Sequence, residues 1–501
     1  MALLDHIPHS EIAERHRPWP RARVGDEGWG RASEMLAAGK LTLLGLWGDA
    51  GDVHMALLDE GGDVAVVSYA CKDGKYPSVA AKHPPAIRLE RAIDSLFGLE
   101  ATGSPDTRPW LDLGFWDVRH PLGKQTPAQK PGAYAFLPAE GEGLHQIPVG
   151  PVHAGIIEPG HFRFTANGEH VVRLEQRLGY THKGIESLMA GAALDAAAKL
   201  AARASGDSTV AYSYAFALAA EAALQIEAPP RAAYLRALMA ELERLANHFG
   251  DIGAICNDAA FALMHAQTGI LRERTLRAAQ ACFGHRLMMD MIVPGGVARD
   301  IAPDGAAALR ALLAEARKRF PRLIELYDNT ASLQDRTVTT GIVRADYARQ
   351  FGAGGYVGRG SGRSFDARRN LNYAPYGALK FEVPVLEAGD VNARVWVRIR
   401  EVEQSLSLIE QILDRLPQGP IMAEPKGNGA PCEGLGIAEA FRGDVLVWLR
   451  LDGGGRVARC HLRDASWFQW PLLETAIEGN IVADFPLCNK SFNCSYSGHD
   501  L

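Results

Sequence analysis

Residues Arg203-Ala204-Ser205-Gly206-Asp207-Ser208 lie within an alanine-rich region whose pattern predicts a buried helix from about 184 to 225. The acidic Asp207 stands out, because an unpaired charge is costly to bury. We therefore expect Asp207 to pair with an arginine, to be functional, or both. Two interpretations of Ser205 and Ser208 are open: they are polar residues of a site, or they are small residues that allow two helices to approach closely.

Three further motifs precede this stretch: Gly150-Pro151-Val152-His153, the run Glu158-Pro159-Gly160-His161-Phe162-Arg163, and the run from Gly179 to Glu186. Together they resemble the large subunit of nickel–iron hydrogenases, and equally the paralogous 49-kDa-type subunit of respiratory complex I. In the hydrogenases, 203–208 would read Arg-x-Cys-Gly-x-Cys, and both thiolates would bind nickel. Here both positions are serine.

The first 140 residues have a different pattern. Short β-type runs at Leu41–Trp47, Val53–Leu58 and Asp63–Tyr69 precede a helical pattern over 89–98, with Gly98 suited to the C-terminal cap. The Glu90–Gly98 run is similar to the signature of the 30-kDa-type subunit of complex I. Residues 99–140 are rich in Gly and Pro and predict a docking tail or linker. We assign 1–140 to a 30-kDa-like domain.

Residues 141–501 are assigned to a hydrogenase-like large-subunit domain. A β-like pattern over 147–180 is followed by the predicted helix 184–225 and by long helical patterns near 231–260, 262–291, 304–332 and 390–416. The predicted fold class is α+β: a small N-terminal α+β domain, then a long-helix bundle with peripheral β-structure. The glycine-rich 350–385 segment favours a mobile loop near a subunit contact over a phosphate cradle. The chain ends in a polar tail, 489–501.

Composition excludes several classes of protein. The 501 residues carry a net charge of −6, which argues against a nucleic-acid partner. No uncharged apolar run of about 18 residues is present, so membrane association is expected through partner subunits. The seven cysteines are scattered and none is spaced Cys-x-x-Cys, which favours structural thiols in a reducing compartment. No dinucleotide fingerprint links this chain to NAD.

We expect this chain to bind no metal ion. Hydrogenases bind nickel with four soft thiolates, two of them in a C-terminal Asp-Pro-Cys-x-x-Cys motif. This chain has Asp484-Phe485-Pro486-Leu487-Cys488 there, and Cys494 follows six residues later, which is the wrong spacing. We favour two buried thiols at these positions over a different metal site.

The resemblance implies that the cleft keeps a polar lining. Glu158 matches a glutamate that relays protons in hydrogenases, and could equally cap a turn. Arg442 matches an arginine that overhangs the metal; here it either binds a substrate oxygen or pairs with Glu439 or Asp207. With Asp207, these are the predicted catalytic residues.

A second set of residues is expected to bind substrate. In complex I a histidine and a tyrosine bind the quinone headgroup, but the tyrosine position here is Leu194 and the histidine loop diverges after His153. The resemblance to complex I therefore does not imply a quinone ligand here, and quinone remains only one possible ligand of the cleft. The remaining candidates are His153, His161, His182, Ser205 and Ser208.

The resemblance to the formate-hydrogenlyase-type (group 4) hydrogenases implies an oxidoreductase subunit at the end of a 4Fe-4S electron wire. The cluster would lie in a partner small subunit, and integral membrane subunits related to antiporters would complete a complex on the cytoplasmic face of the inner membrane. This subunit would couple redox or proton changes in its cleft to ion translocation. The alternatives are a subunit that reduces a quinone or another small molecule, and a non-catalytic scaffold that transmits conformational change. The sequence favours a true hydrogenase least.

Overall fold

A mixed five-stranded sheet, in the order β1-β3-β6-β5-β4, forms the N-terminal unit of the computed structural model, which describes residues 3–128, 130–155, 157–427 and 429–501. Strands β3 and β6 are parallel, and the other neighbours are antiparallel. The three predicted strands are confirmed as β4, β5 and β6. The bounds are β1 Glu11–Ile12, β3 Arg21–Val24, β4 Leu41–Gly48, β5 Asp52–Asp59 and β6 Val64–Ala70.

Two helices accompany this sheet, α1 (Asp26–Ala37) and α2 (Ile87–Phe97). Helix α2 ends at Gly98, which adopts the left-handed conformation (φ 69°), as the sequence predicted. Its apolar face packs toward β4. Two small pairs complete the region: β7 (Lys75–Pro77) with β8 (Glu100–Thr102), and β9 (Val118–Arg119) with β10 (Thr126–Pro127).

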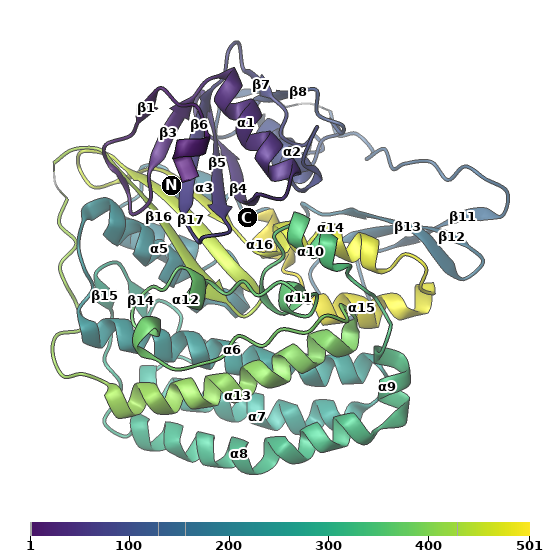
Figure 1. Cartoon of the computed structure of the whole chain (residues 1–501), viewed down its shortest axis with the longest axis vertical. Helices are drawn as coiled ribbons and strands as arrows, with labels where there is room; N and C mark the ends of the chain where they lie inside the picture. Colours follow the sequence, from purple (N-terminus) through teal and green to yellow (C-terminus); the bar gives the residue numbers. More distant parts are fainter. Residues whose placement is uncertain (1–2, 129, 156, 428) are drawn as a thin grey trace.

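The long-helix bundle of the second unit is confirmed (Figure 1). Helix α6 packs between α7 and α13, and α8 lies against α7 and α13. The helices are α6 Pro230–Asp258, α7 Ala262–Phe283, α8 Gly305–Asn329 and α13 Val391–Arg415. Each agrees with its predicted range except that α7 ends early, because Gly284 takes φ 79° and caps it.

The predicted single helix 184–225 is wrong. The chain forms α3 (Ile185–Met189) and α4 (Leu194–Ala201), then turns at Ser205, whose backbone is extended (φ −146°, ψ 120°). A 3₁₀ turn, Gly206–Ser208, then leads into α5 (Thr209–Leu224). Asp207 therefore lies at the start of a helix rather than within one.

Glycines in a strand explain why α5 is rich in alanine. Strand β16 (Cys432–Ala440) lies directly on α5, and a Cβ atom at Gly434 would come within 1.8 Å of the Ala219 carbonyl oxygen. At Gly436 a Cβ would lie 2.1 Å from the Ala215 oxygen. Only small residues on both elements permit this approach. The α5 helix is thereby fixed against the sheet.

The sheet under α5 has four strands in the order β18-β17-β16-β2. Strand β2 (His16–Arg17) comes from the N-terminal region and pairs in parallel with β16. The other two are β17 (Gly443–Leu451) and β18 (Val457–Arg463). One buried cluster joins residues of both units, among them Phe97 and Trp470. The two regions therefore share a core, while the domain limits at 140 and 141 remain predictions.

The predicted linker 99–140 contains a buried anchor. Trp110 is 1% exposed, and the guanidinium groups of Arg88 and Arg91 lie 4.8 and 4.6 Å from its ring centroid.

After the linker, the chain forms the three-stranded antiparallel sheet that the β-pattern at 147–180 predicted. Its strands are β11 Leu144–Val149, β12 His161–Asn167 and β13 His170–Arg177.

The glycine-rich segment 350–385 was expected to be a mobile loop near a subunit contact, but it is partly helical and packed into the fold. It contains α11 (Gly355–Arg359) and α12 (Ala367–Asn370), and Arg359 is fully buried. Arg359 forms ion pairs with Glu401 (2.6 Å) and Glu439 (2.8 Å). Buried arginine needs such partners, and the neighbouring glycines let the backbone pass close to the sheet, since a Cβ at Gly355 would meet the Arg442 carbonyl.

The polar tail is also an inner part of the fold. Helices α15 (Phe485–Phe492) and α16 (Tyr496–Asp500) are largely buried beside α14 (Ser466–Ala476). Asp500 explains this placement, because its carboxylate accepts hydrogen bonds from the Gly179 and Thr181 amides (2.8 and 2.9 Å). Further short elements include α9 Ala331–Thr337, α10 Ala345–Gln350, β14 Ile292–Val293 and β15 Gly296–Val297.

Candidate functional site

The Ser205–Ser208 turn positions Asp207 for a two-pronged ion pair with Arg442, which lies between β16 and β17. The guanidinium donates to the two carboxylate oxygens over 2.7 and 2.6 Å. Burial alone would raise the pKa of Asp207, but the attraction of Arg442 outweighs it and lowers that pKa. Arg442 is therefore the arginine partner that the sequence predicted for Asp207. Glu439, its other expected partner, pairs with Arg359 instead.

The two serines of the turn both contact this ion pair. Ser205 Oγ donates to Asp207 Oδ1 over 2.8 Å, and Arg442 donates to Ser208 Oγ over 3.2 Å. Ser205 and Ser208 are both buried. The positions that would hold thiolates in a hydrogenase thus serve here as hydrogen-bonding neighbours of a salt bridge.

A third serine completes this arrangement, and sequence reasoning missed it. Ser495 Oγ lies 2.8 Å from Ser205 Oγ. Ser495 also caps α16 by accepting from the Gly498 amide over 2.9 Å. Ser495 and Gly498 have the i, i+3 spacing of a Cys-x-x-Cys pair, and that spacing is the signal that could have found them. The segment facing Ser205 therefore begins at Ser495, and not at Cys488.

A cleft of about 510 Å³ opens beside the ion pair. Its wall includes Glu158 and His153 as well as Ser205, Asp207 and Arg442. The Glu158 carboxylate accepts a hydrogen bond from the Ser497 amide (3.0 Å), and His153 Nε2 donates one to the Gly160 carbonyl (2.8 Å). The structure thus brings together the three predicted catalytic residues and one predicted histidine; their roles remain predictions.

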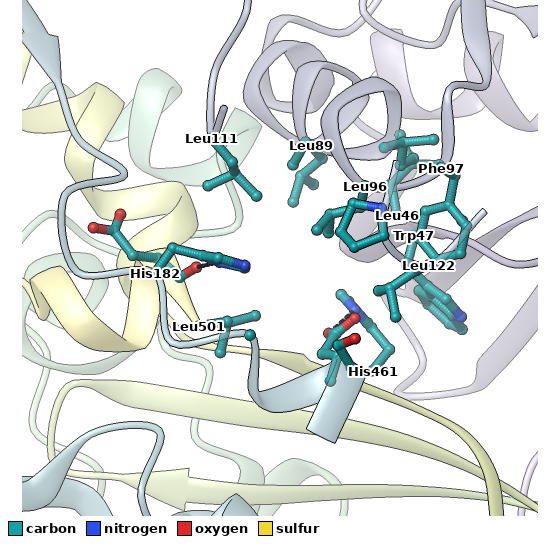
Figure 2. Close-up of a pocket in the computed structure, with 18 of the residues that line it drawn as sticks. Leu46, Trp47, Leu89, Leu96, Phe97, Leu111, Leu122, His182, His461 and Leu501 are labelled. Carbon is teal, nitrogen blue, oxygen red and sulfur yellow. Dashed lines mark hydrogen bonds and ion pairs between the residues drawn. The ribbon is translucent and has the colours of Figure 1, made fainter. Parts of the chain in front are cut away.

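The other two histidines lie elsewhere. His161 Nδ1 donates to the Gly150 carbonyl (3.0 Å) and its ring contacts Phe136. His182 stacks on Trp116 (centroids 4.5 Å apart) and faces a separate cavity, shown in Figure 2. Neither residue is on the wall of the cleft, because β12 and the turn after Gly179 direct them to other surroundings.

The two C-terminal cysteines differ in position. Cys494 lines the cleft, whereas Cys488 is fully buried against Gly341. Burial raises the pKa of the Cys488 thiol to about 11, and burial likewise raises that of Cys494, so both are protonated at neutral pH. Within the described residues, no group of three or more His, Cys, Asp or Glu side chains is arranged to hold a metal ion.

A carboxylate behind the turn is also notable. Glu243 on α6 is buried. Its carboxylate accepts hydrogen bonds from the Val210 and Ala211 amides at the start of α5, over 2.7 and 3.1 Å. Burial raises its pKa to about 8. The sequence alone gives no sign that Glu243 faces the core, so sequence reasoning did not single it out.

Comparison with known proteins agrees with this architecture. Residues 259–434 match the family model of the respiratory-chain NADH dehydrogenase 49 Kd subunit, and residues 52–132 match that of the 30 Kd subunit. The chain is 33% identical to formate hydrogenlyase subunit 5 of Escherichia coli over 85% of this chain and 77% of that protein. It is 34% identical to an NADH-quinone oxidoreductase subunit of Desulfotalea psychrophila, over 67% and 91% of the two chains.

A solved structure is similar as well. A chain of the membrane-bound sulfane sulfur reductase, an archaeal respiratory membrane complex, superposes with a TM-score of 0.67 at 26% identity, over 72% of this chain and 99% of that one. The fold and the cleft thus define an oxidoreductase subunit of the hydrogenase or NADH:quinone oxidoreductase type. This chain belongs to the family of group 4 hydrogenase large subunits and complex I 49-kDa-type subunits, with a 30-kDa-type region fused before it.

Proposed function

We propose that this chain is the nickel-free large subunit of a membrane-bound, complex-I-like respiratory complex. A 4Fe-4S small subunit would deliver electrons to the cleft, and antiporter-like membrane subunits would use the resulting redox and proton changes for ion translocation. Family membership supports this, as do the names of two relatives, a membrane-bound hydrogenase subunit alpha and the respiratory sulfane sulfur reductase complex. The part of the chain that the structure describes contains no helix that qualifies as a membrane span. The proposed position is the cytoplasmic face of the inner membrane, where partner subunits would hold the chain.

The Asp207–Arg442 ion pair carries the nickel-free part of this proposal. Nickel in this family needs soft thiolate ligands. The residues around the ion pair offer the hydroxyls of Ser205, Ser208 and Ser495, and Gly498 offers no side chain. The Arg442 guanidinium lies 3.2 Å from Ser208 Oγ and adds a positive charge that opposes a bound cation. These residues do not fit nickel.

A second candidate function is reduction of an acceptor inside the cleft. Tyr496 lines the cleft, as His153 does, and its hydroxyl interacts with the side chain of Asn489, another residue of the lining. A phenol hydroxyl in this position is suited to donate to an acceptor oxygen, as on a quinone. The membrane-bound sulfane sulfur reductase, named for a different acceptor, has a similar fold. A scaffold without turnover is the third candidate.

Elemental analysis of the complex purified with its partners tests the first proposal. Iron in multiples of four without nickel supports it, and stoichiometric nickel contradicts it. The isosteric variants Asp207→Asn and Glu158→Gln then separate the candidates. If the subunit reduces an acceptor, both variants lose turnover while they still assemble. If the subunit is only a scaffold, the activity of the whole complex is unchanged in both variants.

A further inference from the structure

A groove lies on the outer side of the helix bundle, between α7 and α8. Helix α8 forms the lower edge of the bundle (Figure 1). Gln267 lines the groove from α7, and Ala314, Lys318, Arg322 and Leu323 line it from α8. Its volume is about 630 Å³, within the roughly 300–1,000 Å³ of clefts that bind ligands. The groove and the cleft have no lining residue in common.

The α8 side of this groove is strongly basic. Between Arg310 and Arg322, α8 carries five basic residues and one acidic residue, Glu315. The chain as a whole carries a net charge of −6, so this face has the opposite sign. Complementary charge steers partners toward one patch of a surface. An acidic partner is therefore attracted to this face in particular.

Three of the five cations already pair with carboxylates of this chain. These pairs are Arg310–Asp414 (2.8 Å), Arg317–Glu410 (2.7 Å) and Arg319–Glu315 (3.2 Å). The other two, Lys318 and Arg322, are exposed and form no hydrogen bond or ion pair with any residue that the structure describes. Both lie on the wall of the groove, one helical turn apart. They are the charges that a partner can use.

Exposed apolar side chains lie on the α7 side. Leu263 and Ile270 are 53% and 39% exposed. They stand four residues before and three residues after Gln267, so they share the face of α7 that lines the groove. With Ala314 and Leu323 they form an apolar strip beside the two unpaired cations. The groove is therefore amphipathic.

An amphipathic helix is the occupant that fits this groove. Side-chain ridges of one helix pack into the grooves of its neighbours, and a helix that docks in this way uses anchors at i, i+3, i+4 and i+7. Ala314 is small enough to let a third helix approach. Acidic residues at i and i+4 of that helix would match Lys318 and Arg322, which have the same spacing.

A membrane surface matches the groove less well. Segments that bind anionic lipids by charge carry about four to eight clustered basic residues. Here Lys318 and Arg322 are the two without a carboxylate partner in the described chain, and both line a concave surface. A flat layer of headgroups would contact the ridges of the two helices rather than the groove between them.

We propose that an amphipathic helix with acidic residues, supplied by a partner subunit of the respiratory complex, binds in the groove between α7 and α8. Its carboxylates pair with Lys318 and Arg322, and its apolar residues pack on Leu263 and Ile270. This interface does not depend on whether the cleft is free of nickel or reduces an acceptor.

Photocross-linking in intact membranes, before the complex is purified, tests this interface. The probe is p-benzoylphenylalanine in place of Gln267, which lies in the groove. On illumination it should cross-link to one partner subunit. Mass spectrometry should place the link in a peptide that has acidic residues at i and i+4.

Charge reversal then tests the two cations. Lys318→Glu with Arg322→Glu should lower the yield of the cross-link at least about fivefold, because two attractions become repulsions. Lys40→Glu with Arg400→Glu makes the same change in net charge at exposed positions outside the groove, and should leave the yield unchanged. Changing the acidic residues of the linked peptide to lysine should restore the cross-link to the reversed variant.

If the reversed variant does not assemble, Lys318→Gln with Arg322→Gln removes the charges without repulsion and should lower the yield about twofold to threefold. A link to phospholipid, to a second copy of this chain or to a peptide without acidic residues would overturn the proposal. The absence of any link, or equal yields in the parent and the charge variants, would overturn it as well.

Discussion

Arg442 and Asp207, 235 residues apart in the chain, form a two-pronged ion pair on the wall of the cleft. The arginine side chain is 5% exposed, whereas that of Asp207 is 39% exposed. The pair therefore places a desolvated cation behind a carboxylate that reaches the solvent of the cleft. Removing the carboxylate leaves the buried cation without its main partner.

Asp207→Asn should accordingly destabilise the protein by about 1–3 kcal/mol, because a buried charge loses a charged partner. The comparison is Asp290→Asn, which breaks the exposed pair with Arg203 and should cost less than about 1 kcal/mol. Thermal unfolding of the purified complex measures both. Equal shifts in the two variants would mean that the Arg442 pair is not strengthened by burial.

The 2.8 Å separation of the Ser205 and Ser495 hydroxyls predicts an engineered cross-link. When both residues are changed to cysteine, mild oxidation should join them, since the side chains already meet. Non-reducing electrophoresis should then show a faster-migrating chain that reverts with reductant. The matched control pairs Ser205→Cys with the native Cys488, and it should stay uncross-linked.

Glu243 gives a prediction on pH dependence. Its pKa in the folded protein is about 8 because of burial, against an ordinary value of 4.5. The folded state thus binds the proton of Glu243 more tightly than the unfolded state does. The resulting stabilisation of the fold is complete below about pH 4.5 and is lost as the pH rises through 8. Glu243→Gln should remove that loss.

The melting temperature of Glu243→Gln, compared with the parent, should therefore rise more at pH 9 than at pH 5. Glu60→Gln, at an exposed loop, should follow the parent at both values. Parallel curves for Glu243→Gln and the parent across this range would show that Glu243 is already ionised in the fold.

Contact between α5 and β16 gives a prediction on packing. Gly434→Ala would bring a Cβ to 1.8 Å from the Ala219 carbonyl, and neither backbone can move freely. We expect a loss of at least about 1–3 kcal/mol. Gly30→Ala is the control, because no atom lies within 4 Å of its Cβ and the exchange within α1 favours the helix by up to about 1 kcal/mol.

Much of the fold could be predicted from local patterns. The bundle helices α6, α8 and α13 were predicted to within two or three residues, because their apolar positions recur at helical spacing. The glycine-rich segment and the tail could not be predicted in this way. Their polar residues, such as Arg359 and Asp500, find partners far away in the chain, and composition alone made them look exposed.

For the site, the family resemblance of the sequence predicted that Ser205 and Ser208 replace two thiolates, and the sequence predicted that Asp207 is paired with an arginine, functional, or both. Tertiary structure decided that Arg442 is this cation, that Ser495 faces Ser205, and that His182 belongs to another cavity. The physical reason is one of distance. Helix periodicity and residue chemistry act over a few residues and can be read locally, whereas hydrogen bonds and ion pairs between remote segments depend on how the sheet and α16 bring them together.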